Sequence, residues 1–317
     1  MTAKLNDNND KFLSVLEKCS ICPRECHVNR VKGGMGYCMS GAGFNISSIF
    51  LHMGEEPVIS GKNGICNVFF SHCNLQCVYC QNYQISRNTC CLPDTEMSLE
   101  KSVNEICKIL DSGTNLLGFV SPSHCIPQMK TIIEKLHTID RNPVVVYNSN
   151  AYDKVETLKY IEGLIDVYLP DFKYSDKNLA FELSDVPDYP ETAFSAIKEM
   201  VRQKGTSVRL NNEGQAGSGV IVRHLVLPGH VENSVNALKM LAEEISPLLH
   251  ISLMSQYYPT PAAKKIKGID KKASADEYQK VVDALEHYGF HRGWVQDAES
   301  SGYYKPDFQE EHPFFDK

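Results

Sequence analysis

Residues 71–82, which read SHCNLQCVYCQN, constrain this chain more than any other stretch. Cys73, Cys77 and Cys80 are spaced C-x3-C-x2-C and follow an apolar, β-branched run at residues 65–70 that predicts a strand. A loop leaving a strand end can bring three thiolates around one point. A four-iron cluster held by only three thiolates keeps one iron open to another ligand. The alternative is a fragment of a zinc site that His72 completes.

Composition limits the class of protein. The 317 residues suit one large α/β domain with a small appendage, or two ordinary domains. No run approaches the ~18 apolar residues of a membrane span, and residues 1–12 lack the apolar core of a secretory signal. We therefore predict a cytoplasmic protein with no membrane partner, whose 12 cysteines indicate metal ligation rather than disulfides. The net charge of −7 without Lys/Arg blocks predicts no nucleic-acid partner.

A second group of cysteines lies near the N-terminus. Its members are Cys19, Cys22, Cys26 and Cys38. The spacing C-x2-C-x3-C-x11-C, with glycines before the last cysteine, allows four thiolates to close around zinc or a second iron–sulfur cluster. Spacing does not decide which metal. Thiols that bind nothing are the alternative, although so short a Gly-rich segment cannot build a core of its own. We predict a cysteine-rich metal-binding module over residues 1–44.

From residue 92 onward, amphipathic helical patterns alternate with apolar strand patterns, which is typical of parallel βα units. Strands are predicted at residues 116–120, 144–148, 165–169, 219–227 and 251–257. With the strand before the cysteine loop they make six, and residues 45–53 predict one more. The barrel is expected over residues 45–259. Residues 260–317 are expected to form a C-terminal helical extension, with a last short strand around Trp294.

Polar side chains follow five of these strands. In βα barrels the chemistry lies at the carboxyl ends of the strands, so polar groups at five strand ends favour a polar cofactor pocket. The polar residues are Ser121, Ser123, His124, Asn148, Ser149, Asn150, Asp171, Lys173, Arg223, His224, Ser255 and Gln256.

The cysteine loop resembles the signature of the radical S-adenosylmethionine (SAM) superfamily, with Tyr79 at its aromatic position. In that superfamily SAM chelates the open iron, and the reduced cluster donates one electron to the sulfonium. The resemblance implies a 4Fe–4S cluster on Cys73, Cys77 and Cys80, SAM as cofactor and a 5′-deoxyadenosyl radical. It also implies an α/β fold, a partial (β/α)6 TIM-like barrel whose open side admits a large substrate.

Over residues 64–259 the chain resembles the pyruvate formate-lyase activating enzymes and their relatives. Asp171 and Lys173 match an aspartate-x-lysine that lies near SAM in that family, and Arg223 with the following LVLPG resembles its fifth strand. Lys173 and Arg223 can neutralise a carboxylate. A surface salt bridge is the alternative for Asp171 and Lys173.

The third strand end completes the candidate SAM site. Residues 148–150 align with a SAM-contacting motif that normally begins with aspartate, and Ser149 and Asn150 can hydrogen-bond a carboxylate or ribose. The candidate cofactor-binding residues are Asn148, Ser149, Asn150, Asp171, Lys173, Arg223 and Gln256. One departure is that SPSH at residues 121–124 replaces the family's Gly-Gly-Glu segment. His124 could then serve the substrate side or be a satisfied structural histidine.

A sibling group of these activating enzymes gives a closer resemblance, through CPREC-H-VNR at residues 22–30, GEEPVISG at residues 54–61 and the cysteine loop. The first functional hypothesis is an activase that abstracts a hydrogen from a glycine of a glycyl radical enzyme, with reduced flavodoxin or ferredoxin as electron donor. The second is the same chemistry on a small molecule or peptide. The third is a non-catalytic zinc scaffold. No catalytic side chain is assigned, because the adenosyl radical itself takes the hydrogen.

Overall fold

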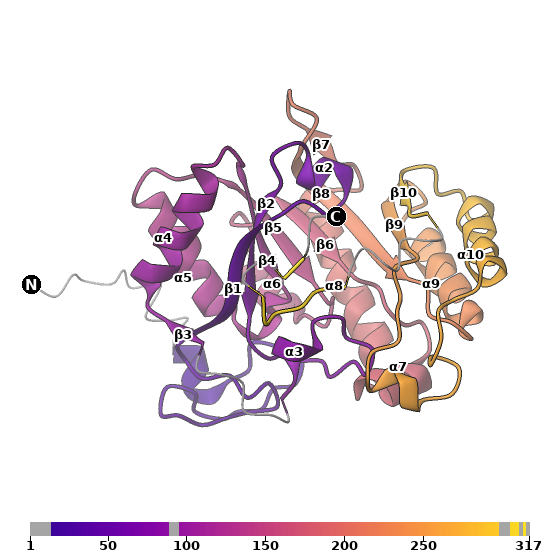
Figure 1. The fold of residues 1–317 in the computed structure, drawn as a ribbon, viewed down its shortest axis with the longest axis horizontal. Coiled ribbons are helices and arrows are strands. Elements are labelled where there is room, and N and C mark those ends of the chain that lie inside the picture. Colours follow the sequence, from indigo (N-terminus) through magenta and orange to yellow (C-terminus); the bar gives the residue numbers. More distant parts are fainter. Residues whose placement is uncertain (1–13, 89–94, 298–304, 311–312, 315–317) are drawn as a thin grey trace, which may run out of the picture.

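A single open sheet forms the centre of the molecule. The computed structural model describes residues 14–88, 95–297, 305–310 and 313–314 (Figure 1). The strand order is β10-β9-β8-β6-β5-β4-β2-β1-β3, with β7 paired to β8 outside this path. The parallel strands are β2 (Ile65–Phe70), β4 (Leu116–Val120), β5 (Val144–Ser149), β6 (Val167–Pro170), β8 (Ala216–Leu225), β9 (His250–Met254) and β10 (Gly293–Val295). The antiparallel strands are β1 (Phe44–His52), β3 (Glu96–Met97) and β7 (Arg209–Leu210).

The six predicted barrel strands lie side by side in their predicted order, as β2, β4, β5, β6, β8 and β9. Each is parallel to the next, and helices connect them, so the predicted α/β partial-barrel fold is confirmed. Every residue of β2 is buried, which explains its continuous apolar sequence. The short strand expected around Trp294 is β10, which extends the sheet beside β9.

Helices cover the sheet and begin at recognisable signals. Ser98 caps the helix that follows it, Asp176 caps another, and Ser274 with Glu277 forms a capping box. The helices are α2 (Pro57–Ser60), α3 (Tyr83–Ser86), α4 (Leu99–Leu110), α5 (Ile126–His137), α6 (Val155–Tyr160), α7 (Lys177–Ser184), α8 (Tyr189–Lys204), α9 (Val231–Glu244) and α10 (Ala275–His287). Short 3-10 helices are η1 (Ser14–Lys18), η2 (Pro122–His124) and η3 (Ala263–Lys265). None of the helices in the described ranges has the length and apolar character needed to cross a bilayer.

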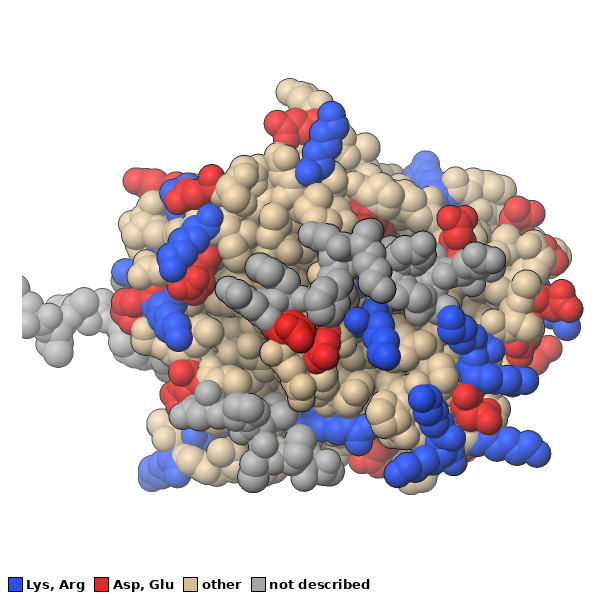
Figure 2. All heavy atoms as spheres, viewed as in Figure 1, with Lys and Arg blue, Asp and Glu red and all other residues tan. Residues whose placement is uncertain are grey.

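The N-terminal cysteines belong to a small module at the lower edge of the sheet in Figure 1, on the side of the cysteine loop. Its own core contains Leu16, Cys19 and Ile21. The module packs on the barrel through polar contacts, among them Thr157 Oγ1 donating to the Ile21 carbonyl at 2.8 Å. The domain boundaries at residues 44 and 259 stay a prediction. On the face seen in Figure 2, acidic and basic side chains are interspersed.

Candidate functional site

A cleft of about 460 Å³ opens beside the cysteine loop at the carboxyl ends of the parallel strands. Its volume lies within the ~300–1,000 Å³ range of small-molecule sites. The predicted site residues that line it are Cys77, Cys80, Asn148, Asp171, Lys173, Arg223 and Gln256. Residues from four strand ends and the loop therefore meet at one place, as the polar strand ends predicted. Cys73 lies behind this lining and is 8% exposed.

The three loop sulfurs each accept a hydrogen bond. Asn150 Nδ2 donates to Cys73 Sγ at 3.4 Å, and Leu75 N donates to the same sulfur at 3.4 Å. Cys77 Sγ accepts from Ser184 Oγ at 3.0 Å, and Cys80 Sγ accepts from Ser86 Oγ at 3.2 Å. Donors aimed at sulfur stabilise thiolates more than neutral thiols. The surroundings of the loop therefore fit metal-bound thiolates.

Burial sets the protonation of these thiols when no metal is bound. It raises the pKa of Cys73 to about 12 and that of Cys77 to about 11. Metal binding would therefore have to displace protons. Within the described ranges, no three His, Cys, Asp or Glu side chains are arranged to hold a metal ion. The assignment of metal ligands in both cysteine groups stays a prediction.

Two predicted SAM contacts point elsewhere. Ser149 is 1% exposed; its hydroxyl donates to Asp153 and accepts from Ala151 N at 2.8 Å. Asn150 donates to Cys73 Sγ and, at 2.8 Å, to Asn74 Oδ1. Both side chains thus organise the turn after β5 and the cysteine loop rather than line the cleft. Of the three residues in this motif, only Asn148 lines the cleft.

Asp171 and Lys173 form a half-buried ion pair in the cleft. Lys173 Nζ lies 2.5 Å from Asp171 Oδ2, and the two side chains are 17% and 22% exposed. Burial alone would lower the pKa of Lys173, but the charges of Asp171 and Cys77 hold it above its usual value. Lys173 therefore stays protonated beside Asp171 and Cys77. The alternative of an exposed surface salt bridge does not describe this geometry.

Arg223 is held by two glutamates that the sequence analysis missed. Its Nε and Nη2 lie 2.8 and 2.9 Å from the two carboxylate oxygens of Glu56, and Nη2 also pairs with Glu55. Burial would raise the pKa of Glu55, but Arg223 keeps it below the usual value. Asn67 donates to Glu55 at 3.0 Å, and Gly118 leaves room for that amide. Because two carboxylates already occupy the guanidinium, a ligand carboxylate would have to displace one of them.

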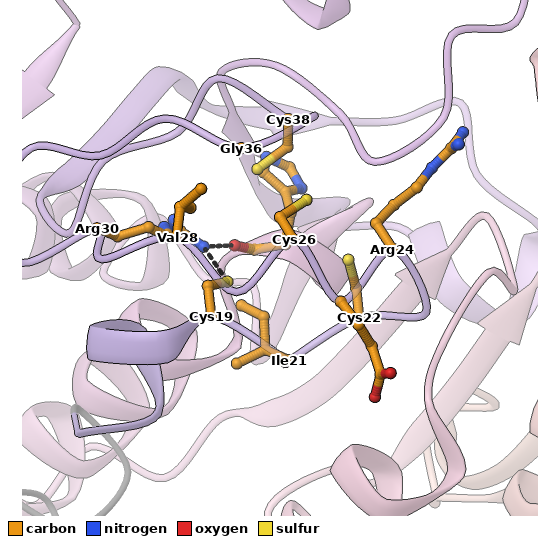
Figure 3. A pocket seen from close by; sticks show the side chains of 11 residues that line it. Cys19, Ile21, Cys22, Arg24, Cys26, Val28, Arg30, Gly36 and Cys38 are labelled. Atoms are coloured by element: carbon orange, nitrogen blue, oxygen red, sulfur yellow. Dashed lines mark hydrogen bonds between the residues drawn. The ribbon is translucent and has the colours of Figure 1, made fainter.

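The four N-terminal cysteines line one small cavity of about 10 Å³ (Figure 3). Their sulfurs also receive donors: Tyr37 N lies 3.3 Å from Cys26 Sγ, and Arg30 Nη1 lies 3.9 Å from Cys19 Sγ. The nearby backbone of Arg24 and of Ser40 lowers the pKa of Cys22 and of Cys38, against the larger effect of burial. Burial raises the pKa of Cys22 to about 12. The structure therefore brings all four predicted ligands, Cys19, Cys22, Cys26 and Cys38, to one cavity.

His124 lines this N-terminal cavity and not the cleft, which argues against the substrate-side alternative for this residue. The side chain is 1% exposed, and its Nε2 lies 3.0 Å from the Ser71 carbonyl. Among the described residues its Nδ1 has no hydrogen-bond partner. β4 ends at Val120, directly before the SPSH segment, and the short helix η2 carries His124 to the N-terminal cavity.

The module touches the cysteine loop directly. Arg24 Nε donates to the Asn74 carbonyl at 3.1 Å, and its guanidinium lies 3.6 Å over the ring of Tyr37. Asn88 donates to the carbonyls of Tyr37 and Cys73 at 2.7 and 2.8 Å. The two cysteine groups are therefore joined through the backbone on either side of Cys73.

Comparisons with other proteins give one relative by sequence. The chain is 28% identical over 282 residues to an uncharacterised protein of Methanocaldococcus jannaschii, which covers 87% of this chain and 76% of that relative. No protein-family model matches the chain.

Solved structures give partial likenesses. A domain of the pyruvate-formate lyase-activating enzyme from Bacteroides vulgatus aligns with 54% of this chain and 93% of its own, at 15% identity and a TM-score of 0.39. The FeFe-hydrogenase maturase HydG from Carboxydothermus hydrogenoformans aligns with 72% of this chain and 52% of its own, at 13% identity and 0.48. Streptococcus suis SuiB bound to S-adenosylmethionine aligns with 74% and 52%, at 12% identity and 0.48. The chain thus spans about half the length of the last two, and its resemblance to radical SAM enzymes rests on its cysteine loop and strand order.

Proposed function

We propose that this protein is a radical SAM enzyme that cleaves SAM reductively to a 5′-deoxyadenosyl radical. The observation that carries the proposal is the cysteine loop itself. Cys73, Cys77 and Cys80 follow β2, each sulfur accepts a hydrogen bond, and two of the three face an open cleft. A 4Fe–4S cluster on these thiolates would supply the electron, with one iron left for SAM.

The cleft residues would bind and orient SAM. Lys173 would pair with its carboxylate, and Asp171 would accept hydrogen bonds from its amino group. Asn148 and Gln256 would offer amides to the ribose or the base, since both line the same cleft. Ser184 and Asn150 would hold the loop thiolates through the hydrogen bonds already described. The ion-paired Glu55, Arg223 and Glu56 would form another polar part of the cleft wall.

For the substrate we propose hydrogen abstraction from a glycine in a partner protein, with reduced flavodoxin or ferredoxin as donor. An open sheet edge and a cleft lined by polar and aromatic groups support a large substrate. A peptide or small molecule is the second candidate, because SPSH replaces the activating enzymes' Gly-Gly-Glu segment.

The cysteine content fits a cytoplasmic setting. We also propose that the N-terminal cysteines bind zinc or a second iron–sulfur cluster.

An anaerobic assay tests the enzyme assignment. Iron and sulfide are counted, the protein is reduced, SAM is added, and 5′-deoxyadenosine and methionine are measured. Cleavage is expected in the native chain and lost in the triple variant Cys73→Ala, Cys77→Ala, Cys80→Ala. Cys107→Ala is the matched control, because this half-buried thiol lies on α4 and does not line the cleft. Zinc without iron and no cleavage would favour the scaffold hypothesis.

Deuterium transfer separates the substrate candidates. In one incubation, the enzyme and SAM are mixed with proteins extracted from its source cells after growth on deuterated glycine. In the other, they are mixed with deuterated small molecules or peptides. Deuterium in 5′-deoxyadenosine from a protein fraction that gains a glycine radical supports the activase. Transfer from a small molecule or a short peptide alone supports the second candidate.

A further inference from the structure

Arg30 is a buried cation at the wall of the N-terminal cavity. The residue is 2% exposed and lines the cavity beside the four cysteines (Figure 3). Its Nη2 and Nε donate to the Gly41 carbonyl at 2.6 and 3.1 Å, and Nη1 donates to the His124 carbonyl at 2.7 Å. Nη1 also points to Cys19 Sγ at 3.9 Å. Every strong contact of the guanidinium is therefore with a neutral group.

A guanidinium in this position needs an anion. Arginine keeps its charge inside proteins, and a buried charge is normally paired with a charge of opposite sign. In the part of the chain that the structure describes, none of the ion pairs includes Arg30. Arg223, the other deeply placed arginine, has two carboxylates around it. Carbonyl dipoles alone leave the charge of Arg30 uncompensated. The neighbouring groups able to become anions are the thiols of Cys125, Cys38 and Cys19, and the last two line the cavity.

We propose that Arg30 is the counter-cation of a negatively charged metal–thiolate centre formed by Cys19, Cys22, Cys26 and Cys38. This inference rests on the proposed metal at the N-terminal cysteines and goes beyond it by assigning the group that balances its charge. Four thiols that take up Zn²⁺ release four protons and leave a centre with two negative charges. A four-iron cluster with a 2+ core leaves the same charge. Arg30 therefore fits either metal and excludes a neutral, fully protonated cysteine group as the working state.

His124 is a second observation at the same cavity. Its buried Nδ1 has no hydrogen-bond partner among the described residues, and its own carbonyl holds Arg30. A buried polar nitrogen without a partner is unfavourable unless another group reaches it. Because Nε2 donates to the Ser71 carbonyl, Nδ1 is a hydrogen-bond acceptor, so a donor in the cavity would satisfy it and a thiolate would not. The proposal therefore rests on the guanidinium of Arg30.

The test uses the full chain with Cys73→Ala, Cys77→Ala and Cys80→Ala, so that bound metal reports on the N-terminal cysteines alone. Arg30→Met and Arg30→Lys are made in this background. Lys32→Met is the matched control, because Lys32 carries the same charge in the same module but is exposed and does not line the cavity. Zinc affinity is measured by competition with a chromogenic chelator. Iron and sulfide are counted after anaerobic reconstitution.

We expect Arg30→Met to weaken metal binding about 10–100-fold, as for other residues that support metal ligands, and Arg30→Lys to weaken it less. Lys32→Met should keep the native affinity. Equal affinity in Arg30→Met and the parent overturns the proposal, and so does a parent that binds neither zinc nor iron. Neither result bears on SAM cleavage, which is measured separately in the native chain, so a failure of this proposal is distinguishable from a failure of the proposed function.

A stability comparison covers the case in which Arg30→Met folds poorly. The four N-terminal cysteines are replaced by serine, and Arg30→Met is added to that chain. If Arg30 serves the centre, removing its charge lowers the unfolding midpoint of the metal-loaded chain but does not lower that of the serine chain. An equal loss in both chains would assign Arg30 to packing alone and overturn the proposal.

Discussion

The two cysteine groups are built from similar parts but differ in what surrounds them. In both, hydrogen-bond donors point at the sulfurs and a cation lies close by. The loop of Cys73, Cys77 and Cys80 faces a cleft of about 460 Å³, whereas the N-terminal group encloses about 10 Å³. Lys173, beside the loop, forms an ion pair with Asp171, whereas Arg30 donates hydrogen bonds to backbone carbonyls and has no carboxylate partner among the described residues.

With the proposed metals bound, this difference would separate two kinds of metal site. Structural sites close all positions around the metal, while catalytic sites keep one open for substrate. Three thiolates beside a cleft leave such a position, and four thiolates around a small cavity do not. The cation beside each group follows the same division, because a lysine in a cleft can turn to a ligand and a buried arginine cannot. The loop is therefore expected to do the chemistry and the module to hold the loop.

Paired cysteine substitutions should break the comparison most clearly. Cys77→Ser with Cys80→Ser should reduce formation of 5′-deoxyadenosine to background, because one remaining thiolate would not hold the cluster. Cys22→Ser with Cys26→Ser should leave cleavage per bound loop cluster within about threefold but lower the thermal midpoint by roughly 5–10 °C. Product analysis and calorimetry measure the two effects. If both pairs abolish cleavage equally at full loop-cluster content, the module takes part in the chemistry and the division fails.

Arg223 sharpens the contrast between the buried cations. Arg223→Met leaves Glu55 and Glu56 without their cation, and this should lower the free energy of unfolding by about 3–5 kcal/mol. Arg202→Met is the control: Arg202 also pairs with two glutamates, but it is 52% exposed, so a much smaller loss than in Arg223→Met is expected. Urea unfolding measures both. Adding Glu55→Gln and Glu56→Gln should recover part of the loss, and no recovery would show that packing causes it.

Much of the fold could be predicted because it depends on local patterns. Alternating helical and apolar runs placed the six parallel strands in order, and cysteine spacing found both groups of thiols. The polar strand ends located the cleft for the same reason, since parallel strands end on one side.

The missed residues act over long separations in the chain. Glu55 and Glu56 meet Arg223 across 168 and 167 positions, and Arg30 meets His124 across 94. No periodicity reports such pairs. In the sequence, Glu55 and Glu56 stand out only as part of GEEPVISG, and that motif does not indicate which residue they contact. Ser149 and Asn150 were expected at SAM because the motif fixed their position in the chain, but it could not fix the direction of their side chains.

The buried His224, which lies on β8 but does not line the cleft, gives a pH test. Burial lowers the pKa of His224 to about 4, and its ring contacts the Phe172 carbonyl at 2.6 Å and Ser234 Oγ at 2.8 Å. The unfolded chain protonates it near pH 6.5, so its contribution is fully present above that pH and is lost as the pH falls toward about 4. Between pH 7.5 and 5 we expect the free energy of unfolding to fall by about 2 kcal/mol through this group. Urea titrations should show a shallower fall in His224→Gln, and an unchanged pH slope would contradict the assignment.

The smallest expected effect concerns the donors to sulfur. In the module, Cys26 accepts from a backbone N–H, but in the loop Cys77 accepts from the Ser184 hydroxyl, which substitution can remove. Such a hydrogen bond stabilises the more negative, reduced cluster, so Ser184→Ala should lower its reduction potential by roughly a few tens of millivolts. A potentiometric titration followed by electron paramagnetic resonance measures the shift. Tyr174→Phe is the control, because the Tyr174 hydroxyl contacts Ser184 at 2.6 Å while the bond from Ser184 to Cys77 would remain. A potential that moves equally in both variants would assign the effect to packing around α7, and the hydroxyl of Ser184 would then not distinguish the loop from the N-terminal group.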